Sequence, residues 1–120
     1  MVKKASSPSH CFGVRLRQAR ERMGLPQDKL GVLIGLDEGC SSARISRYET
    51  GVHQPAFEIA RNLAQVLGVC VTYFYCEDDW LADIVLRLGH LNAMQRTSLE
   101  TWLTNEVNLD LVQNSKPVIS

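Results

Sequence analysis

The 120-residue sequence lacks any long uninterrupted stretch of apolar residues. None approaches the roughly 18 residues that a membrane-spanning helix needs, so we expect no interaction with a membrane. Residues 1–10 contain two lysines but no apolar segment after them, and therefore differ in composition from a secretory signal. We expect a cytoplasmic protein in which residues 1–10 form a flexible tail.

Cysteine is scarce, and its spacing lacks the pattern of a metal or redox centre. The four cysteines lie at positions 11, 40, 70 and 76, and the three histidines are also scattered. No two cysteines are separated by the two residues that are typical of a zinc knuckle or a redox motif. We expect reduced thiols, two of them partly buried, with no metal and no cofactor. Metal binding or redox sensing by these thiols is the alternative.

The sequence also lacks a glycine-rich loop for binding phosphate groups, an internal repeat and any segment with the pattern of a β-strand. The adjacent acids Asp78 and Asp79 precede an amphipathic helix, where carboxylates stabilise the helix N-terminus. Because no arrangement of residues indicates catalysis, we do not expect an enzyme.

An excess of charge of either sign is missing as well, although the average conceals an asymmetry. The whole chain has 13 Lys/Arg and 13 Asp/Glu. Residues 1–68 have ten Lys/Arg and six Asp/Glu, a net charge of +4, whereas residues 69–120 have three and seven, a net charge of −4. This division predicts that the first half can lie near phosphate groups and that the second half cannot.

Helical periodicity is present throughout and predicts an all-α protein. Pro26 suits the start of a helix, and several helices are followed by a glycine. Gly31 lies inside a predicted helix, at a cost of up to about 1 kcal/mol relative to alanine, which indicates that another helix crosses close by. The first helix carries Arg15, Arg17 and Arg22 on its other face. The residues predicted to face inward are Phe12, Leu16, Ala19 and Met23; Leu30, Leu33 and Ile34; Ile45 and Tyr48; Ala60, Leu63, Ala64 and Leu67; and Val71, Phe74 and Tyr75. Two later helices are predicted from the apolar residues Leu81, Ile84, Val85 and Leu88 and from Leu99, Trp102, Leu103 and Val107.

The helix predicted to follow a loop at residues 37–40 has an unusual outer face. Ser41 is its expected N-cap, and the outward residues Ser42, Ala43 and Ser46 are short. Short side chains would let the helix lie deep in the major groove of DNA. There Arg44 or Arg47 could bind a guanine through two acceptors, a contact worth about 1–3 kcal/mol of discrimination. The alternative is that both arginines are solvated charges on an ordinary helix.

Residues 12–75 resemble the lambda-repressor-like (Xre-type) helix-turn-helix family. The matching residues, in order, are Gly24-Leu25, Gln27, Leu30, Gly31, Gly35, Ser41, Ile45-Ser46-Arg47-Tyr48-Glu49, Gly51, Pro55, Leu63-Ala64 and Leu67-Gly68. The resemblance implies a five-helix DNA-binding domain, which we place at residues 11–76 and which usually works as a dimer. Two departures are a turn at 37–40 that is about four residues longer, and Pro26 where relatives have a capping serine.

The resemblance also implies roles for individual residues. Ser42, Ala43 and Arg47 would face bases, while Gln27, Thr50 and Gln54 would face the DNA backbone. Arg20 and Glu49 would form a structural pair. Together with the residues argued from the pattern, the expected DNA-binding set is Gln27, Ser41, Ser42, Ala43, Arg44, Ser46, Arg47, Thr50 and Gln54.

The remaining sequence predicts a helical hairpin at residues 77–112, followed by a flexible tail at residues 113–120. Its apolar residues favour dimerisation, with folding back on the first domain as the alternative. We therefore expect a transcriptional regulator, most often a repressor, that binds a palindromic operator in double-stranded DNA as a homodimer. The alternative is an antitoxin or adaptor whose hairpin binds a toxin or another protein. The expected dimerisation residues are Trp80, Leu81, Ile84, Leu88, Leu99, Trp102 and Leu103.

Overall fold

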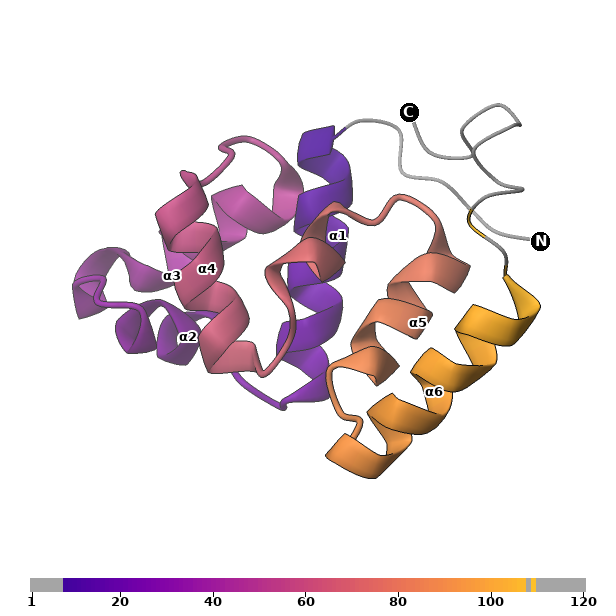
Figure 1. The fold of residues 1–120 in the computed structure, drawn as a ribbon. Helices are drawn as coiled ribbons and strands as arrows, with labels where there is room; N and C mark the ends of the chain where they lie inside the picture. Colours follow the sequence, from indigo (N-terminus) through magenta and orange to yellow (C-terminus); the bar gives the residue numbers. More distant parts are fainter. Residues whose placement is uncertain (1–7, 108, 110–120) are drawn as a thin grey trace. The chain divides into compact units, whose positions relative to one another are not determined.

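The computed structural model describes residues 8–107 and 109, and this part of the chain is helical without a β-strand. The predicted all-α class is confirmed (Figure 1). No helix in the described range is both long enough and apolar enough to cross a membrane. The predicted tail at 113–120 lies outside the described residues. The elements are α1 (Pro8–Arg22), α2 (Gln27–Leu33), α3 (Glu38–Thr50), α4 (Phe57–Leu67), the 3₁₀ helix η1 (Val71–Tyr75), α5 (Asp79–Leu88) and α6 (Ala93–Glu106).

The chain divides into two compact units, residues 1–89 and residues 90–120. The first unit contains α1 to α5 around one apolar core, and helix α1 begins at Pro8, inside the segment predicted to be a tail. Most of the predicted inward-facing residues of this unit are buried, because side chains at helical intervals share one face. The core residues are Phe12, Leu16, Ala19, Leu30, Ile45, Tyr48, Ala60, Leu63, Ala64, Leu67, Tyr73, Phe74, Cys76 and Ala82.

Within residues 12–75, three residues that were predicted to face inward are exposed instead. Met23 is 52% exposed and Leu33 is 58% exposed. Each lies at the end of its helix, and the apolar residues that follow, Leu25 and Ile34, pack against the core instead. Tyr75 is 40% exposed, and Tyr73 takes its expected place in the core. The cause is the 3₁₀ geometry of η1, whose three-residue turns place different residues on one face than an α-helix would.

The predicted start of α3 is also wrong. Residues 38–40 form the first turn of the helix and not a loop, and the N-cap residue is Asp37. Ser41 lies inside α3, fully buried, and its hydroxyl donates a hydrogen bond to the carbonyl oxygen of Asp28 at 2.6 Å. The longer segment between α2 and α3 therefore lengthens α3 by one turn.

Helix α5 belongs to the first unit and packs on its core, whereas the prediction placed residues 77–112 in a separate hairpin. Ala82 is 1% exposed, and Leu81 lies against the same core. The side chain of Asp78 caps the helix by accepting hydrogen bonds from the backbone N–H groups of Trp80 and Leu81. This is the helix N-terminal role expected for the acids at 78 and 79.

The second unit contains α6, which begins with the predicted capping box. Asn92 accepts a hydrogen bond from the backbone N–H of Gln95 at 2.8 Å, and the side-chain oxygen of Gln95 accepts from the backbone N–H of Asn92 at 3.0 Å. None of the residues of α6 is buried. The capping box therefore defines where α6 begins, and the apolar residues of this helix are at most half-buried.

The thiols occupy two kinds of environment, and the expectation of two partly buried cysteines is confirmed. Cys11 and Cys76 are buried, and burial raises the pKa of both thiols. Cys40 and Cys70 are exposed, and hydrogen bonding from Thr72 lowers the pKa of the Cys70 thiol. Among the described residues, no three side chains of His, Cys, Asp or Glu come together as a metal site.

Candidate nucleic-acid interface

Helix α3 is held against α1 and α2 by its inner face. Ile45 and Tyr48 lie in the core, and the backbone of Glu49 passes very close to α1. A Cβ atom added to Gly13 would lie 2.2 Å from the carbonyl oxygen of Glu49, which is too close for any side chain. This close approach at Gly13 was not predicted, because a glycine inside a helix does not by itself identify the helix that crosses it.

The second close crossing is the one predicted at Gly31. A Cβ atom there would lie 1.9 Å from the hydroxyl oxygen of Ser41 and 3.0 Å from its Cα atom. Small residues on both helices thus allow α2 and α3 to approach closely. Ser41, which was expected among the DNA-binding residues, is part of this internal contact, and its burial removes it from the outer surface.

The outer face of α3 presents short side chains and two cations to solvent. Ser42, Ala43, Arg44 and Arg47 are exposed, and Ser46 is half-buried. The outward direction of these residues follows from the burial of Ile45 and Tyr48 on the opposite side. An arginine on such a face can present its guanidinium to a base edge or a phosphate without a bulky neighbour in the way.

A hydrogen-bond network connects the interior to this outer face. Arg20 of α1 forms a bidentate ion pair with Glu49, in which the Nη2 atom of Arg20 donates a hydrogen bond to Oε1 of Glu49 at 3.1 Å. The side-chain amide of Gln27 donates to the same Oε1 at 3.0 Å, and the hydroxyl of Ser42 donates to the amide oxygen of Gln27 at 3.3 Å. The hydrogen bond with Glu49 raises the pKa of Arg20. The pair implied by the resemblance is present, and it also orients Gln27 beside the outer face of α3.

The two other residues expected at the DNA backbone lie where α3 ends. Thr50 is exposed, and its hydroxyl donates to the carbonyl oxygen of Ser46 at 2.9 Å, within its own helix. Gln54 is exposed in the segment after Gly51, which has a φ of 81° and so adopts a backbone conformation that favours glycine. Both side chains are accessible to a ligand that lies along this end of α3.

Acidic residues restrict the other end of α3. Asp37 and Glu38 are exposed at its N-terminus, where a carboxylate interacts favourably with the helix dipole. The negative charge of the same carboxylates would repel a phosphate group at that end. The cations that are free to meet an anion lie further along the helix, at Arg44 and Arg47.

The residues expected at a dimer interface differ in how exposed they are. On α5, Trp80 and Leu88 are exposed and Ile84 is half-buried, and their spacing of four places them on one stripe. Leu81 does not belong to this stripe, because it packs against the core of the first unit. On α6, Trp102 and Leu103 are exposed, and Leu99 is half-buried.

The predicted position of Arg15 is wrong. It was expected on the outer face of the first helix, yet it is only 4% exposed. Its guanidinium contacts the carbonyl oxygens of Cys76 and Glu77 and the carboxylate of Asp79. No signal in the local sequence distinguishes it from the exposed Arg17, since these contacts come from a segment more than 60 residues away.

Comparisons with known proteins agree with this geometry. A family model described as a helix-turn-helix domain matches residues 12–71, which is half of the chain. Proteins from Sinorhizobium medicae (strain WSM419) and Rhizobium meliloti (strain 1021), each described as an uncharacterized HTH-type transcriptional regulator, are 32% identical over 63 residues. The match covers 52% of this chain and 42% of each relative, so the chain spans less than half the length of these curated relatives.

A solved structure extends the likeness beyond the matched domain. The transcriptional regulator BswR is 36% identical to this chain, with a TM-score of 0.78. The match covers 81% of this chain and 96% of the BswR chain.

Proposed function

The chain belongs to the helix-turn-helix domain family, and from this premise we propose that it is a sequence-specific DNA-binding transcriptional regulator that places α3 in the major groove. The observation that carries the proposal is the outer face of α3. Its exposed residues are short, apart from Arg44 and Arg47, while the bulky residues Ile45 and Tyr48 are buried. A helix of this shape can approach base edges closely, and its arginines supply the donors that guanine accepts.

The network behind α3 supports a division of roles between its neighbours. Because Gln27 is bound to Glu49 and Ser42, its side chain lies at the edge of the α3 surface. In this position it would contact the DNA backbone together with Thr50 and Gln54. Contacts to the backbone fix the position of a protein on the duplex, and contacts to base edges provide the sequence preference. Ser42, Ala43 and Arg47 are the proposed base-facing residues, with Arg44 and Ser46 beside them.

We further propose that the protein acts as a homodimer on a palindromic operator, most often as a repressor. The apolar stripe of Trp80, Ile84 and Leu88 on α5 is one apolar surface that a second copy could cover, and the exposed Trp102 and Leu103 on α6 are another. Two copies related by a twofold axis would present two α3 helices to successive major grooves, about 34 Å apart. A palindromic sequence matches this symmetry.

The proposed DNA contact can be tested by selecting bound duplexes from a random pool with the full chain and then measuring variants on the selected sequence. Arg47→Ala should weaken binding by about 1–3 kcal/mol and relax the preference at one base pair. Gln27→Ala should weaken binding to all sequences alike, because a backbone contact carries no sequence information.

Arg87→Ala is the matched control, since it removes an exposed arginine from α5, where it pairs with Asp83. It should leave the base preference unchanged. If the wild-type protein selects no preferred sequence, or if Arg47→Ala behaves as Arg87→Ala does, the proposed function is wrong.

The exposed apolar residues of α6 also favour a second candidate, an antitoxin or adaptor that uses this helix to bind a toxin or another protein. The surface of Trp102 and Leu103 fits a protein partner as well as it fits a second copy. Copurification of the full chain with a stoichiometric partner that Trp102→Ala releases would favour this candidate. A pure homodimer with full operator affinity would exclude it.

A further inference from the structure

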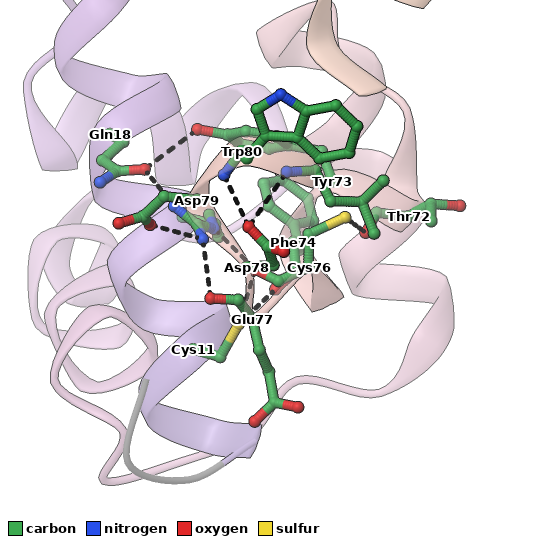
Figure 2. Close-up of polar contacts among 12 residues, drawn as sticks. Cys11, Gln18, Thr72, Tyr73, Phe74, Cys76, Glu77, Asp78, Asp79 and Trp80 are labelled. Atoms are coloured by element: carbon green, nitrogen blue, oxygen red, sulfur yellow. Dashed lines mark hydrogen bonds and ion pairs between the residues drawn. The ribbon is translucent and has the colours of Figure 1, made fainter. Parts of the chain in front are cut away.

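Arg15 binds the segment that leads from the core into α5. Figure 2 labels its partners Cys76, Glu77 and Asp79 in this segment. The Nε atom of Arg15 donates to the carbonyl oxygen of Cys76 at 2.8 Å. Its Nη2 atom donates to the carbonyl oxygen of Glu77 at 3.3 Å and lies 2.8 Å from a carboxylate oxygen of Asp79. Nη1 donates to the side-chain oxygen of Gln18 at 3.2 Å. One side chain of α1 thus contacts three positions within four residues at the start of α5.

These contacts fix both the distance and the orientation of the segment 76–79 relative to α1. The side chain of Arg15 is 5% exposed, and a buried charge is stable only when hydrogen-bonding partners replace the water it has lost. A guanidinium is planar, and its donors point in fixed directions, so its acceptors must lie in a matching arrangement. Cys76, Glu77 and Asp79 can satisfy Arg15 only while this segment keeps its present course.

A second attachment follows one turn later. Ala82 is 1% exposed in the core of the first unit, with Val85 packed on the same side. The stripe of Trp80, Ile84 and Leu88 lies on a different side of α5. Two attachments close together therefore determine both the direction of α5 and the side on which its apolar stripe faces outward.

We propose that Arg15 is a positioning residue that fixes α5 relative to α3 and thereby sets the half-site spacing that the dimer accepts in its operator. This inference depends on the proposed function, in which two copies bind a palindrome through surfaces of α5 and α6. In such a dimer, a rigid path leads from each α3 through the core and α5 to the twofold axis. A small rotation at the start of α5 would displace the α3 helices relative to each other.

The experiment measures affinity for duplexes that carry two copies of the half-site selected by the wild-type protein, with spacers that increase by single base pairs. The main variant is Asp79→Ala, which removes the charged partner of Arg15 but changes a residue whose side chain is half exposed. Asp83→Ala is the matched control, because Asp83 is an acid of the same helix that pairs with the exposed Arg87. Arg15→Lys keeps the positive charge and removes the planar arrangement of donors.

We expect the wild-type protein and Asp83→Ala to prefer the same single spacing. Asp79→Ala should reduce the affinity ratio between that spacing and the adjacent ones by about tenfold, the effect of losing one charge-assisted hydrogen bond. Arg15→Lys should relax the preference in the same direction. Affinity for a duplex with one half-site should stay within about twofold in both variants, because α3 and its seating are unchanged.

Two results would overturn the inference while leaving the proposed function intact. One is a spacing preference in Asp79→Ala that equals that of Asp83→Ala. The other is an equal loss of affinity for single half-sites and for all spacings, which would mean that Arg15 serves only the stability of the DNA-binding unit. If the wild-type protein binds no paired half-sites better than a single one, the proposed dimeric function fails, and this inference fails with it.

Discussion

Glu49 joins three helices through a single carboxylate. Its backbone belongs to α3, and its side chain accepts hydrogen bonds from Arg20 of α1 and Gln27 of α2. Its side chain is 4% exposed and that of Arg20 is 12% exposed, so the pair is largely removed from water. Removing one partner of such a pair leaves a charge without compensation, which costs much more than the intact pair contributes.

We therefore predict that Glu49→Gln lowers the free energy of unfolding by about 3 kcal/mol, because Arg20 stays buried without its counter-charge. Glu21→Gln is the control, since Glu21 forms an exposed ion pair with Arg17, which lies one turn away in α1. That change should cost no more than about 0.5 kcal/mol. Urea titration followed by circular dichroism measures both values, and equal effects of the two substitutions would contradict the prediction.

At the scale of the helices, the position of α3 depends on two glycines in its neighbours. Gly13 of α1 meets the backbone of Glu49, and Gly31 of α2 meets Ser41. The contact at Gly31 also explains why residue 41 is a serine. Its small side chain fits beneath α2, and its hydroxyl finds an acceptor in Asp28. The outer face of α3 is therefore set by packing on its inner side.

Gly31→Ala is predicted to destabilise the protein by about 1–3 kcal/mol, because the new methyl group would overlap Ser41 and force the helices apart. DNA affinity should fall as well, since α3 would move. Gly39→Ala is the matched control within α3, where an added Cβ atom has no heavy atom within 4 Å. It should stabilise the protein by up to about 1 kcal/mol, because residues 38–40 are helical.

Thermal unfolding of the two variants separates these effects. A lower melting temperature for Gly31→Ala and a higher one for Gly39→Ala are the expected results. No stabilisation by Gly39→Ala would contradict the extra turn of α3, and no loss in Gly31→Ala would contradict the close crossing of α2 and α3.

At the scale of the whole molecule, charge and apolar surface are unevenly distributed along the chain. The first 68 residues have a net charge of +4 and the rest have −4. The exposed arginines of α3 lie in the basic half, and the exposed tryptophans Trp80 and Trp102 lie in the acidic half. This separation fits a protein that uses its first half for DNA and its second half for a second copy of itself.

Trp102→Ala should weaken self-association by about 2 kcal/mol or more, which corresponds to about 30-fold, if Trp102 lies at the centre of the dimer interface. Affinity for the palindrome should fall with it, whereas affinity for one half-site should not change. Thr97→Ala is the control, because Thr97 lies on the other face of α6 and donates to the carbonyl oxygen of Ala93. Sedimentation equilibrium that shows the same association for both variants would exclude Trp102 from the interface.

The sequence by itself determined the helical class, most of the core and the exposed residues of α3. These features depend on local rules: side chains at helical intervals share a face, and glycine adopts the left-handed conformation at Gly24, Gly35, Gly51 and Gly68. The capping box at Asn92 and the resemblance of residues 12–75 to a known domain are local in the same sense.

Only the tertiary structure decided which polar residues are buried. Arg15 and Arg17 are indistinguishable in the local pattern, yet Arg15 is buried because acceptors arrive from residues 76, 77 and 79. Ser41 was an expected cap and DNA contact, and it is buried because Gly31 leaves room for it. A polar side chain can leave water only where another segment supplies its hydrogen bonds. That partner is fixed by the packing of the fold and not by the neighbouring sequence.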